Sequence, residues 1–302
     1  MNNKFTICKA NAKQHNTILN LFPKISEEDS NNSIAYVAIS DTNAVIGRIL
    51  IIEREVPSPI CGRYWYIINL YVDPDYRRMK IATKLVETVK KQAENDNIVY
   101  LYGSAESTPQ ATFFWFSQGF TLNAYGRKGE DPTKPLEYGN FNHLFSYCVK
   151  RKIISAGDSS YKIRKISRDE IINIINKLFA DERKKEYHLS KIDSQFGFVI
   201  DDDNGKIKGA IFAFPDSMQP PMDSTRWWIT LFVEPEHRNK GIGKTLVHHM
   251  YQYAQDKDVV QLSNIGSDND SVFWLNVGFD IFFWSPNSKT GARQVTSMLR
   301  IK

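Results

Sequence analysis

Cysteine is scarce in this chain, which has only Cys8, Cys61 and Cys148 among its 302 residues. The three lie far apart and form no Cys-x-x-Cys pair, a pattern that argues against a disulfide framework and against a zinc site. The sequence has no uninterrupted run of about 18 apolar residues, which a membrane-spanning helix would need. Its first residues also contain no apolar core typical of a signal peptide. We therefore expect a cytoplasmic protein that binds no metal and no membrane.

Long runs of basic residues are also missing. The chain has 39 Lys and Arg against 34 Asp and Glu, which gives a formal net charge of +5. Proteins that bind nucleic acid usually carry a basic arm or a basic face, so nucleic acid is not an expected partner. Hydrophobic residues make up 42% of the chain. This composition argues for packed cores rather than disorder, and the length suffices for two domains.

The same sequence pattern occurs twice along the chain. The matched segments are DPDYRR (73–78) with EPEHRN (234–239), and FFWFSQGF (113–120) with VFWLNVGF (272–279). A period near 160 residues is too long for a solenoid repeat and fits a duplicated domain. We predict an N-terminal domain at 1–152 and a C-terminal domain at 158–302. The boundary falls in the small and polar residues of 150–160.

Each copy has the same order of expected elements. A short strand leads to an amphipathic helix, at 169–185 in the second copy, and then to two strands. In the second copy Asn204 and Gly205 give a hairpin turn signal between these strands. An aromatic strand, a helix, a strand, a helix and two closing strands follow. The fold class expected is α/β, with two tandem domains that each have a mixed, mostly antiparallel central sheet flanked by helices.

The helix after the aromatic strand shows helical spacing of apolar residues in both copies. These residues are Ile81, Leu85, Val89 and Ala93 in the first copy, and Ile242, Leu246, Val247, Met250 and Ala254 in the second. We expect them to face the core. The pattern thus predicts one buried helix in each domain.

The start of that helix in the second copy, RNKGIGK, combines bare backbone with positive charge. The first N–H groups of a helix have no partner within it, and the helix dipole adds partial positive charge. Gly241 and Gly243 leave that backbone uncovered, while Arg238, Lys240 and Lys244 add cations. Such a helix start favours a phosphate group. An isolated Gly-x-Gly is also explained by close packing of the helix on a strand.

The strand before this loop ends at Pro235, and a strand that stops pairing there leaves backbone groups for an extended ligand. The whole pattern resembles the GNAT superfamily of acyl-CoA-dependent acetyltransferases. The residues that carry the resemblance are Val233, Pro235, Arg238, Gly241, Gly243, Trp274, Gly278 and Phe279. It covers essentially the whole chain, as two tandem GNAT-like domains. It implies direct transfer of an acetyl group from acetyl-CoA, as cosubstrate, to a small-molecule or peptide amine.

The resemblance also implies which residues bind CoA. They are Leu231, Val233, Arg238, Asn239, Lys240, Gly241, Ile242, Gly243, Lys244 and Ser267. The loop 238–244 would wrap the pyrophosphate, and the backbone of Leu231 and Val233 would bond the pantetheine and the acetyl carbonyl. Ser267 takes the place of a common family asparagine, unless the loop is slipped by two and Asn269 takes it.

The first copy departs from the family pattern, because Lys80 and Ala82 stand where the two glycines should be. Two interpretations fit: a weakened CoA site, or a domain that is now structural. In both copies a tryptophan, Trp115 or Trp274, replaces the family's frequent tyrosine, the general acid. An indole N–H is a donor but no useful acid, so we expect both rings in the core.

Glu234 is the candidate general base, although a carboxylate beside a helix start also simply balances the dipole. The glycines with flanking Arg and Lys favour a CoA thioester over an aminoacyl-tRNA as donor. The alternative to an enzyme is a non-catalytic tandem module that binds acyl-CoA or another ligand. The sequence names no acceptor, and two fused domains are compatible with a monomer or a homodimer.

Overall fold

The computed structural model describes residues 5–56, 62–106, 108–126, 141–149, 158, 160–217, 225–257, 259–283 and 294–301. The chain divides into two compact units, Met1–Lys150 and Arg151–Lys302. The connecting segment predicted at 150–160 lies outside the described residues except at 158 and 160. The predicted domain limits, 1–152 and 158–302, stay predictions.

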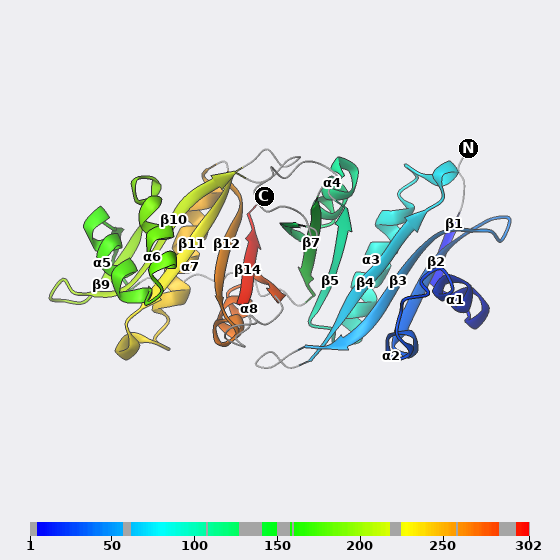
Figure 1. The fold of residues 1–302 in the computed structure, drawn as a ribbon, viewed down its shortest axis with the longest axis horizontal. Coiled ribbons are helices and arrows are strands. Elements are labelled where there is room, and N and C mark those ends of the chain that lie inside the picture. Colours follow the sequence, from blue (N-terminus) through cyan, green and yellow to red (C-terminus); the bar gives the residue numbers. More distant parts are fainter. Residues whose placement is uncertain are drawn as a thin grey trace. The chain divides into compact units, whose positions relative to one another are not determined.

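The N-terminal unit is built in the predicted order of elements. It contains β1 (Phe5–Lys9), α1 (Ala12–Leu19), α2 (Glu27–Asn31), β2 (Ser33–Ser40), β3 (Val45–Glu55), β4 (Arg63–Val72), α3 (Ile81–Asn95), β5 (Tyr100–Glu106), α4 (Pro109–Ser117), β6 (Thr121–Gly126) and β7 (Phe141–Cys148). Its described strands form one sheet in the order β1-β2-β3-β4-β5-β7-β6. Helix α3 covers one face of this sheet, and α1 and α2 cover the other (Figure 1).

The C-terminal unit repeats this arrangement. It contains β8 (Ile163–Lys165), α5 (Arg168–Leu178), α6 (Glu182–Ser190), β9 (Phe196–Asp201), β10 (Ile207–Ser217), β11 (Thr225–Val233), α7 (Ile242–Gln255), β12 (Val259–Ser267), α8 (Ser271–Asn276), β13 (Asp280–Phe283) and β14 (Gln294–Arg300). The sheet order is β8-β9-β10-β11-β12-β14-β13, the same as the order of the corresponding strands in the N-terminal unit. The predicted fold class, a mixed and mostly antiparallel sheet in each half, is confirmed.

One strand pair in each sheet is parallel, and it is short. β4 pairs with β5 from Tyr64 to Ile67, and β11 pairs with β12 from Thr225 to Trp228. Beyond these points β4 and β11 continue to Val72 and Val233 without this partner. In each sheet the two parallel strands therefore diverge beyond this pairing. We call this opening, between β4 and β5 or between β11 and β12, the splay.

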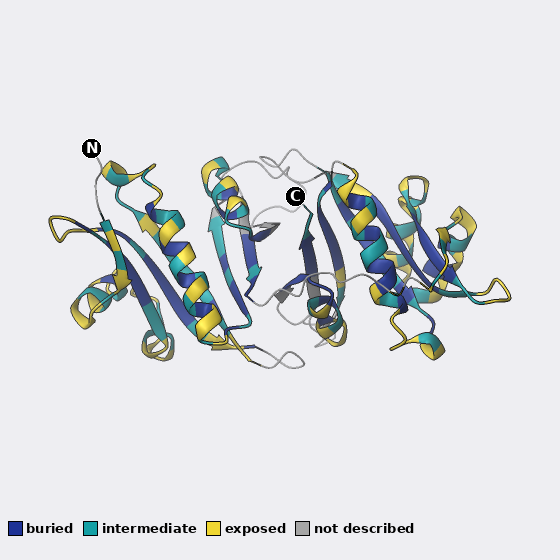
Figure 2. Cartoon of the chain, turned by 180° about the vertical axis from the view of Figure 1, so that it is seen from behind, coloured by how far each residue is buried: buried dark blue, intermediate teal, exposed yellow. Residues whose placement is uncertain are grey.

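The main helix of each unit buries the apolar stripe that its sequence predicts. Ile81, Leu85, Val89 and Ala93 of α3 are buried, as are the five predicted residues of α7. Figure 2 shows the buried side of each helix turned toward its sheet and the exposed side turned outward. Both helices begin over a glycine of a neighbouring strand. A Cβ on Gly47 would lie 2.8 Å from Cγ2 of Ile81, and a Cβ on Gly209 would lie 2.7 Å from Cγ2 of Ile242.

The helix expected at 169–185 is instead two helices, α5 and α6. Helix α5 begins with a capping box between Ser167 and Glu170 and ends at Leu178. Phe179 adopts an extended conformation, and the carboxylate of Asp181 then accepts the N–H groups of Arg183 and Lys184 to start α6. Because aspartate is a strong N-cap residue, it begins a new helix here.

Candidate active site

A cavity of about 1840 Å³ lies within the C-terminal unit, along the splayed part of β11. Phe232 packs with α5 in one core cluster, whereas the ring of Trp227 lies 5.8 Å from that of Tyr253 on α7. Even-numbered residues of β11 therefore face α5 and α6, and odd-numbered ones face α7. The lining includes both sets, among them Trp228 and Leu231. The cavity thus joins the two faces of the sheet through the splay.

The end of β11 turns backbone N–H and C=O groups toward this opening. The N–H of Glu234 bonds the carbonyl of Lys208, on the β10 side. Because successive residues of a strand point their N–H and C=O groups to opposite sides, those of Leu231 and Val233 point toward β12, which has already diverged. This is the arrangement in which an extended ligand can bond to the edge of a strand.

Asn264 of β12 sits at the point where the two strands separate. Its Nδ2 donates to the carbonyl of Ile229 at 3.0 Å. The residue is 8% exposed, lines the cavity, and its Oδ1 has no partner among the described residues. An enclosed carbonyl oxygen without a donor is costly, so a ligand N–H at this point would be favoured.

The loop before α7 contains two residues with positive φ angles. Asn239 and Gly241 have φ angles of 59° and 83°, in the left-handed region that asparagine and glycine tolerate best. A Cβ on Gly241 would meet nothing within 4 Å, so the side chain is missing on an open surface rather than in a tight contact. At Gly243 a Cβ would lie 3.3 Å from the ring of Phe273, which also lines the cavity.

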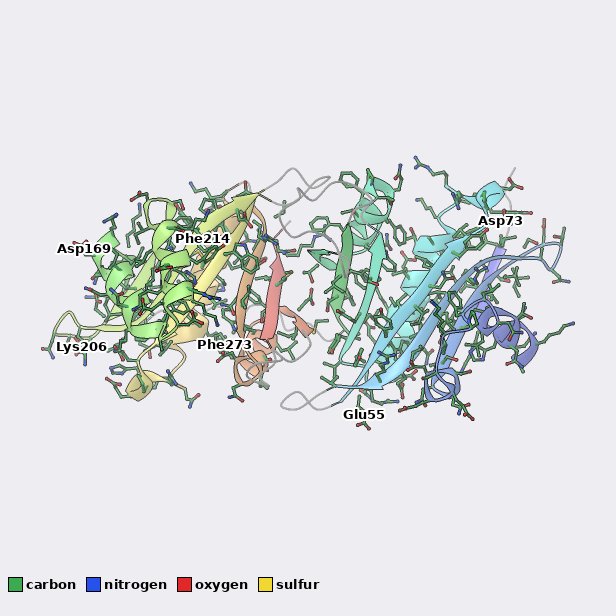
Figure 3. All side chains as sticks on the ribbon, in the orientation of Figure 1. Glu55, Asp73, Asp169, Lys206, Phe214 and Phe273 are labelled. Atoms are coloured by element: carbon green, nitrogen blue, oxygen red, sulfur yellow. The ribbon has the colours of Figure 1, made fainter. Side chains whose placement is uncertain are left out.

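The close-packing explanation of the glycines therefore applies in part to Gly243 and not to Gly241. The first N–H groups of α7, from Ile242 onward, have no carbonyl within the helix to bond. Figure 3 labels Phe273 on α8 and Phe214 on β10, which line the cavity from different elements.

Two basic residues of the loop have structural contacts that the sequence did not indicate. Arg238 donates from Nε to the carbonyl of Val233 at 3.2 Å, which ties the loop to the end of β11. Arg77 makes the same bond to Val72 at 3.3 Å in the N-terminal unit. The backbone carbonyl of Lys240 accepts the hydroxyl of Tyr161 at 2.8 Å.

Most of the predicted CoA-binding residues come together at the cavity. Those that line it are Leu231, Val233, Arg238, Asn239, Gly241, Ile242, Gly243 and Lys244. Lys240 and Ser267 are not among the lining residues, and the side chain of Ser267 lies outside the described ones. Asn269, the alternative to Ser267, does line the cavity. The roles of all these residues remain predictions.

Glu234, the predicted base, lies next to the cavity wall rather than in it. Its side chain is 11% exposed, and its carboxylate forms an ion pair with Lys177 of α5. The Lys177 ammonium also lies 5.2 Å from the centre of the Phe232 ring. These contacts give Glu234 a structural role, while its catalytic role stays a prediction.

The other end of the cavity includes Phe214, Asp216 and Arg226, which no sequence pattern singled out. It also includes Tyr187 and His188 of α6 and Trp228 of β11. The His188 ring stacks on Phe179 with centroids 4.5 Å apart. Burial, with a smaller effect of Lys184, lowers the pKa of His188 below its usual 6.5. Burial, followed by Asp216, raises the pKa of Tyr187, which therefore stays protonated near neutral pH.

Comparison with known families bears on both units. The model of the acetyltransferase (GNAT) family matches the chain twice, over residues 7–120 and 163–279. The chain belongs to the GNAT acetyltransferase family. It is a tandem member, with one GNAT domain in each half. A search of curated proteins finds no match.

Similar solved structures are GNAT proteins as well. A GNAT acetyltransferase from Staphylococcus aureus Mu50 is 19% identical, matching 49% of this chain and 100% of its own with a TM-score of 0.36. One from Elizabethkingia anophelis with acetyl-CoA bound is 19% identical, over 49% of this chain and 99% of its own, with a TM-score of 0.37. The structure that contains the glucosamine N-acetyltransferase region of a fungal multi-domain β-N-acetylglucosaminidase is 12% identical. The match covers 86% of this chain and 35% of that chain, with a TM-score of 0.33.

The N-terminal GNAT domain differs at the splay. Its strand β4 has a bulge at Ile68, because Leu50 pairs with Asn69 while the next residue, Ile51, pairs with Ile67. The pairing of β10 with β11 shows no such shift. A cavity of about 480 Å³ in this domain is lined by Arg78 and residues of α4, and by none of β4.

Both tryptophans at the family's tyrosine position are buried, as the sequence predicts. Trp115 is 5% exposed and stacks on Phe145 with centroids 3.9 Å apart, and Trp274 is 4% exposed. Trp274 also lines the cavity of its domain. Neither can act as the usual acid.

No group of three or more His, Cys, Asp and Glu side chains in the described residues is arranged to hold a metal ion. None of the described helices combines the length and apolar character needed to cross a bilayer. The expectations of a metal-free protein and of a cytoplasmic location stay predictions.

Proposed function

We propose that the C-terminal GNAT domain transfers an acetyl group from acetyl-CoA directly to an amine. The observation that carries this proposal is the continuous cavity from the bare loop at α7, through the splay of β11 and β12, to the side chains under α6. A thioester carrier and an acceptor entering from opposite faces of the sheet would meet at the splay. When bound, acetyl-CoA supplies the activated acetyl group.

Residues of this domain fit such a carrier. The open surface at Gly241 and the free N–H groups at the start of α7 suit a pyrophosphate, with Lys244 as a nearby cation. The backbone groups of Leu231 and the N–H of Val233 suit the amides of the pantetheine arm, while the carbonyl of Val233 accepts Nε of Arg238. The N–H of Val233 would stabilise charge on the thioester oxygen, as an oxyanion hole does.

The acceptor amine must lose a proton before it attacks, since amines are mostly protonated near neutral pH. Glu234 remains the base predicted from sequence, but its carboxylate is held by Lys177 outside the cavity lining. His188 is the second candidate. It lines the cavity, and its lowered pKa keeps it neutral and able to accept a proton at pH 7. The attack itself needs no covalent enzyme intermediate.

Thiol release from acetyl-CoA, followed with a panel of amines, tests the proposed function. We expect release that depends on both substrates. Binding of acetyl-CoA without release for any amine would instead favour the alternative, a non-catalytic module that binds acyl-CoA. A loss of release in His188→Gln, with release kept in Glu234→Gln, would assign the base to His188. The reverse result would assign it to Glu234.

A further inference from the structure

The acceptor end of the cavity has aromatic walls. Tyr187 of α6, Phe214 of β10 and Trp228 of β11 line it, and the rings of Tyr187 and Phe214 meet edge to face at 6.0 Å. Tyr187 is 51% exposed although it is large and aromatic. An exposed aromatic side chain at the mouth of a cavity is a common recognition surface for a flat or apolar group.

An arginine, Arg226, lies at this acceptor end of the cavity, which we call the acceptor chamber. The side chain of Arg226 is 14% exposed, and its Cζ lies 4.5 Å from the centre of the Trp228 ring. Its Nη2 donates to Oδ2 of Asp216 at 2.5 Å, and the same oxygen accepts Nε1 of Trp228 at 2.9 Å. The Nε of Arg226 is enclosed without a partner among the described residues. The guanidinium is thus fixed in place while part of its donor set is unused.

The charges around this chamber do not balance. Arg183 and Lys184 of α6 line it together with Arg226, whereas Asp216 is its single acidic lining residue within the described part of the chain. The other acidic lining residue, Asp270, belongs to the turn before α8. Three cations against one anion make the chamber attractive to an anionic group and unfavourable for a polycation.

We propose that the acceptor is an amine that also carries an anionic group, a carboxylate or a phosphate, on a body small enough to lie between the aromatic walls. This inference rests on the proposed function. The guanidinium of Arg226 binds the anionic group, since its planar fork matches carboxylate and phosphate geometry. Asp216 holds that fork in place. Polyamines and aminoglycosides are excluded as preferred acceptors because they bring several positive charges to a positive chamber.

Binding measured without acetyl-CoA tests acceptor recognition separately from transfer. Isothermal titration would compare L-phenylalanine with L-phenylalaninamide, and 2-aminoethyl phosphate with ethanolamine, with spermidine as the polycation. In at least one pair, we expect the compound with the anionic group to bind at least about tenfold more tightly than the compound without it, the size of one charge-assisted hydrogen bond. The preferred pair identifies the anion as carboxylate or phosphate. Equal affinities within both pairs, or tightest binding of spermidine, would overturn the proposal.

Variants of Arg226 provide the matched control. Arg226→Met should remove the preference within the pair: the compound with the anionic group should bind about tenfold more weakly, while the compound without it changes little. Arg226→Lys keeps the charge without the fork and should restore part of the preference. Unfolding profiles check that the variants fold. A preference that survives in Arg226→Met contradicts the assignment. Preferential binding without thiol release would reject the proposed transfer and leave the recognition site standing.

Discussion

The loops before α3 and before α7 have the same backbone shape but different residues. In the N-terminal domain Arg78 and Lys80 have φ angles of 68° and 62°, where the C-terminal domain has Asn239 and Gly241 at 59° and 83°. Long side chains in the left-handed region cost about 1–2 kcal/mol per residue. The N-terminal loop therefore keeps its shape against local preference. The duplicated core maintains the fold, while individual side chains decide whether a ligand can approach.

The two splays differ in the same way. Gly103 in the N-terminal domain occupies the place of Asn264, and a Cβ there would lie 2.5 Å from the ring of Phe145. Phe145 pairs with Gly103, just as Ser297 pairs with Asn264. An aromatic ring thus fills the space that a polar amide lines in the C-terminal domain. We propose that, among the described residues, Phe145 occupies the place where a pantetheine arm would lie.

The largest effect is expected from a negative charge at the α7 loop. Gly241→Glu introduces a carboxylate where we propose that the phosphates bind, and it strains a residue with positive φ, so the affinity for CoA should fall by at least about 100-fold. Lys80→Glu places the same carboxylate in the matching N-terminal loop and should leave the affinity unchanged. Calorimetric titration of both variants checks this. An unchanged affinity in Gly241→Glu would remove the loop from the site.

Transplanting the N-terminal splay into the C-terminal domain should have the next largest effect. The double variant Asn264→Gly, Ser297→Phe adds the ring and removes the amide, which should reduce the affinity for acetyl-CoA about tenfold or more by occluding the cavity. Near-ultraviolet circular dichroism checks that the variant is packed. If this correctly folded variant bound and turned over acetyl-CoA like the parent, the splay would not be the route of the thioester.

A smaller effect concerns stability in the N-terminal loop. Lys80→Gly relieves a left-handed lysine and should stabilise α3 by about 1 kcal/mol, after part of the gain is lost to the more flexible unfolded chain. Gly241→Ala is the opposite change and should destabilise α7 by a similar amount. Hydrogen exchange of each helix in the full chain measures both. Destabilisation by Lys80→Gly would mean that the lysine side chain holds the loop.

The smallest expected effect is a difference in acid stability between the first helices of the two domains, α1 and α5. Glu170 closes the capping box of α5, and a hydrogen bond from Arg164 lowers its pKa from 4.5 to about 2. Since the folded value is the lower one, its stabilisation is present above pH 4.5 and is lost as the pH falls through about 2. The α1 box uses Asn11 and Gln14, which do not titrate there. Lowering the pH should therefore reduce the protection of backbone amides from hydrogen exchange at the start of α5 but not at the start of α1. An equal loss of protection in both helices would contradict this.

Patterns that act over a few residues could be predicted from the sequence. The apolar spacing of α7, the left-handed Gly241 and the two buried tryptophans are set by local preference and by the need to bury large apolar surface. The break between α5 and α6 carried a signal too, since Asp181 followed by Glu182 is a typical helix start.

The acceptor chamber could not be predicted in this way. Asp216 and Arg226 meet only because β10 and β11 pair in one register, and Asn264 meets Ile229 only where β11 and β12 separate. The bulge at Ile68 likewise depends on strand pairing rather than on a local pattern. These contacts depend on tertiary structure, which the repeat in the sequence indicates but does not specify.

The most direct test counts the CoA molecules bound to the full chain and locates them. Titration with acetyl-CoA up to about 1 mM, the upper range of typical substrate affinities, should give one molecule per chain. Hydrogen exchange should show protection at residues 229–244 and none at the matching 67–83. Protection confined to the N-terminal segment, or no binding at 1 mM, about the weakest affinity expected, would contradict the account.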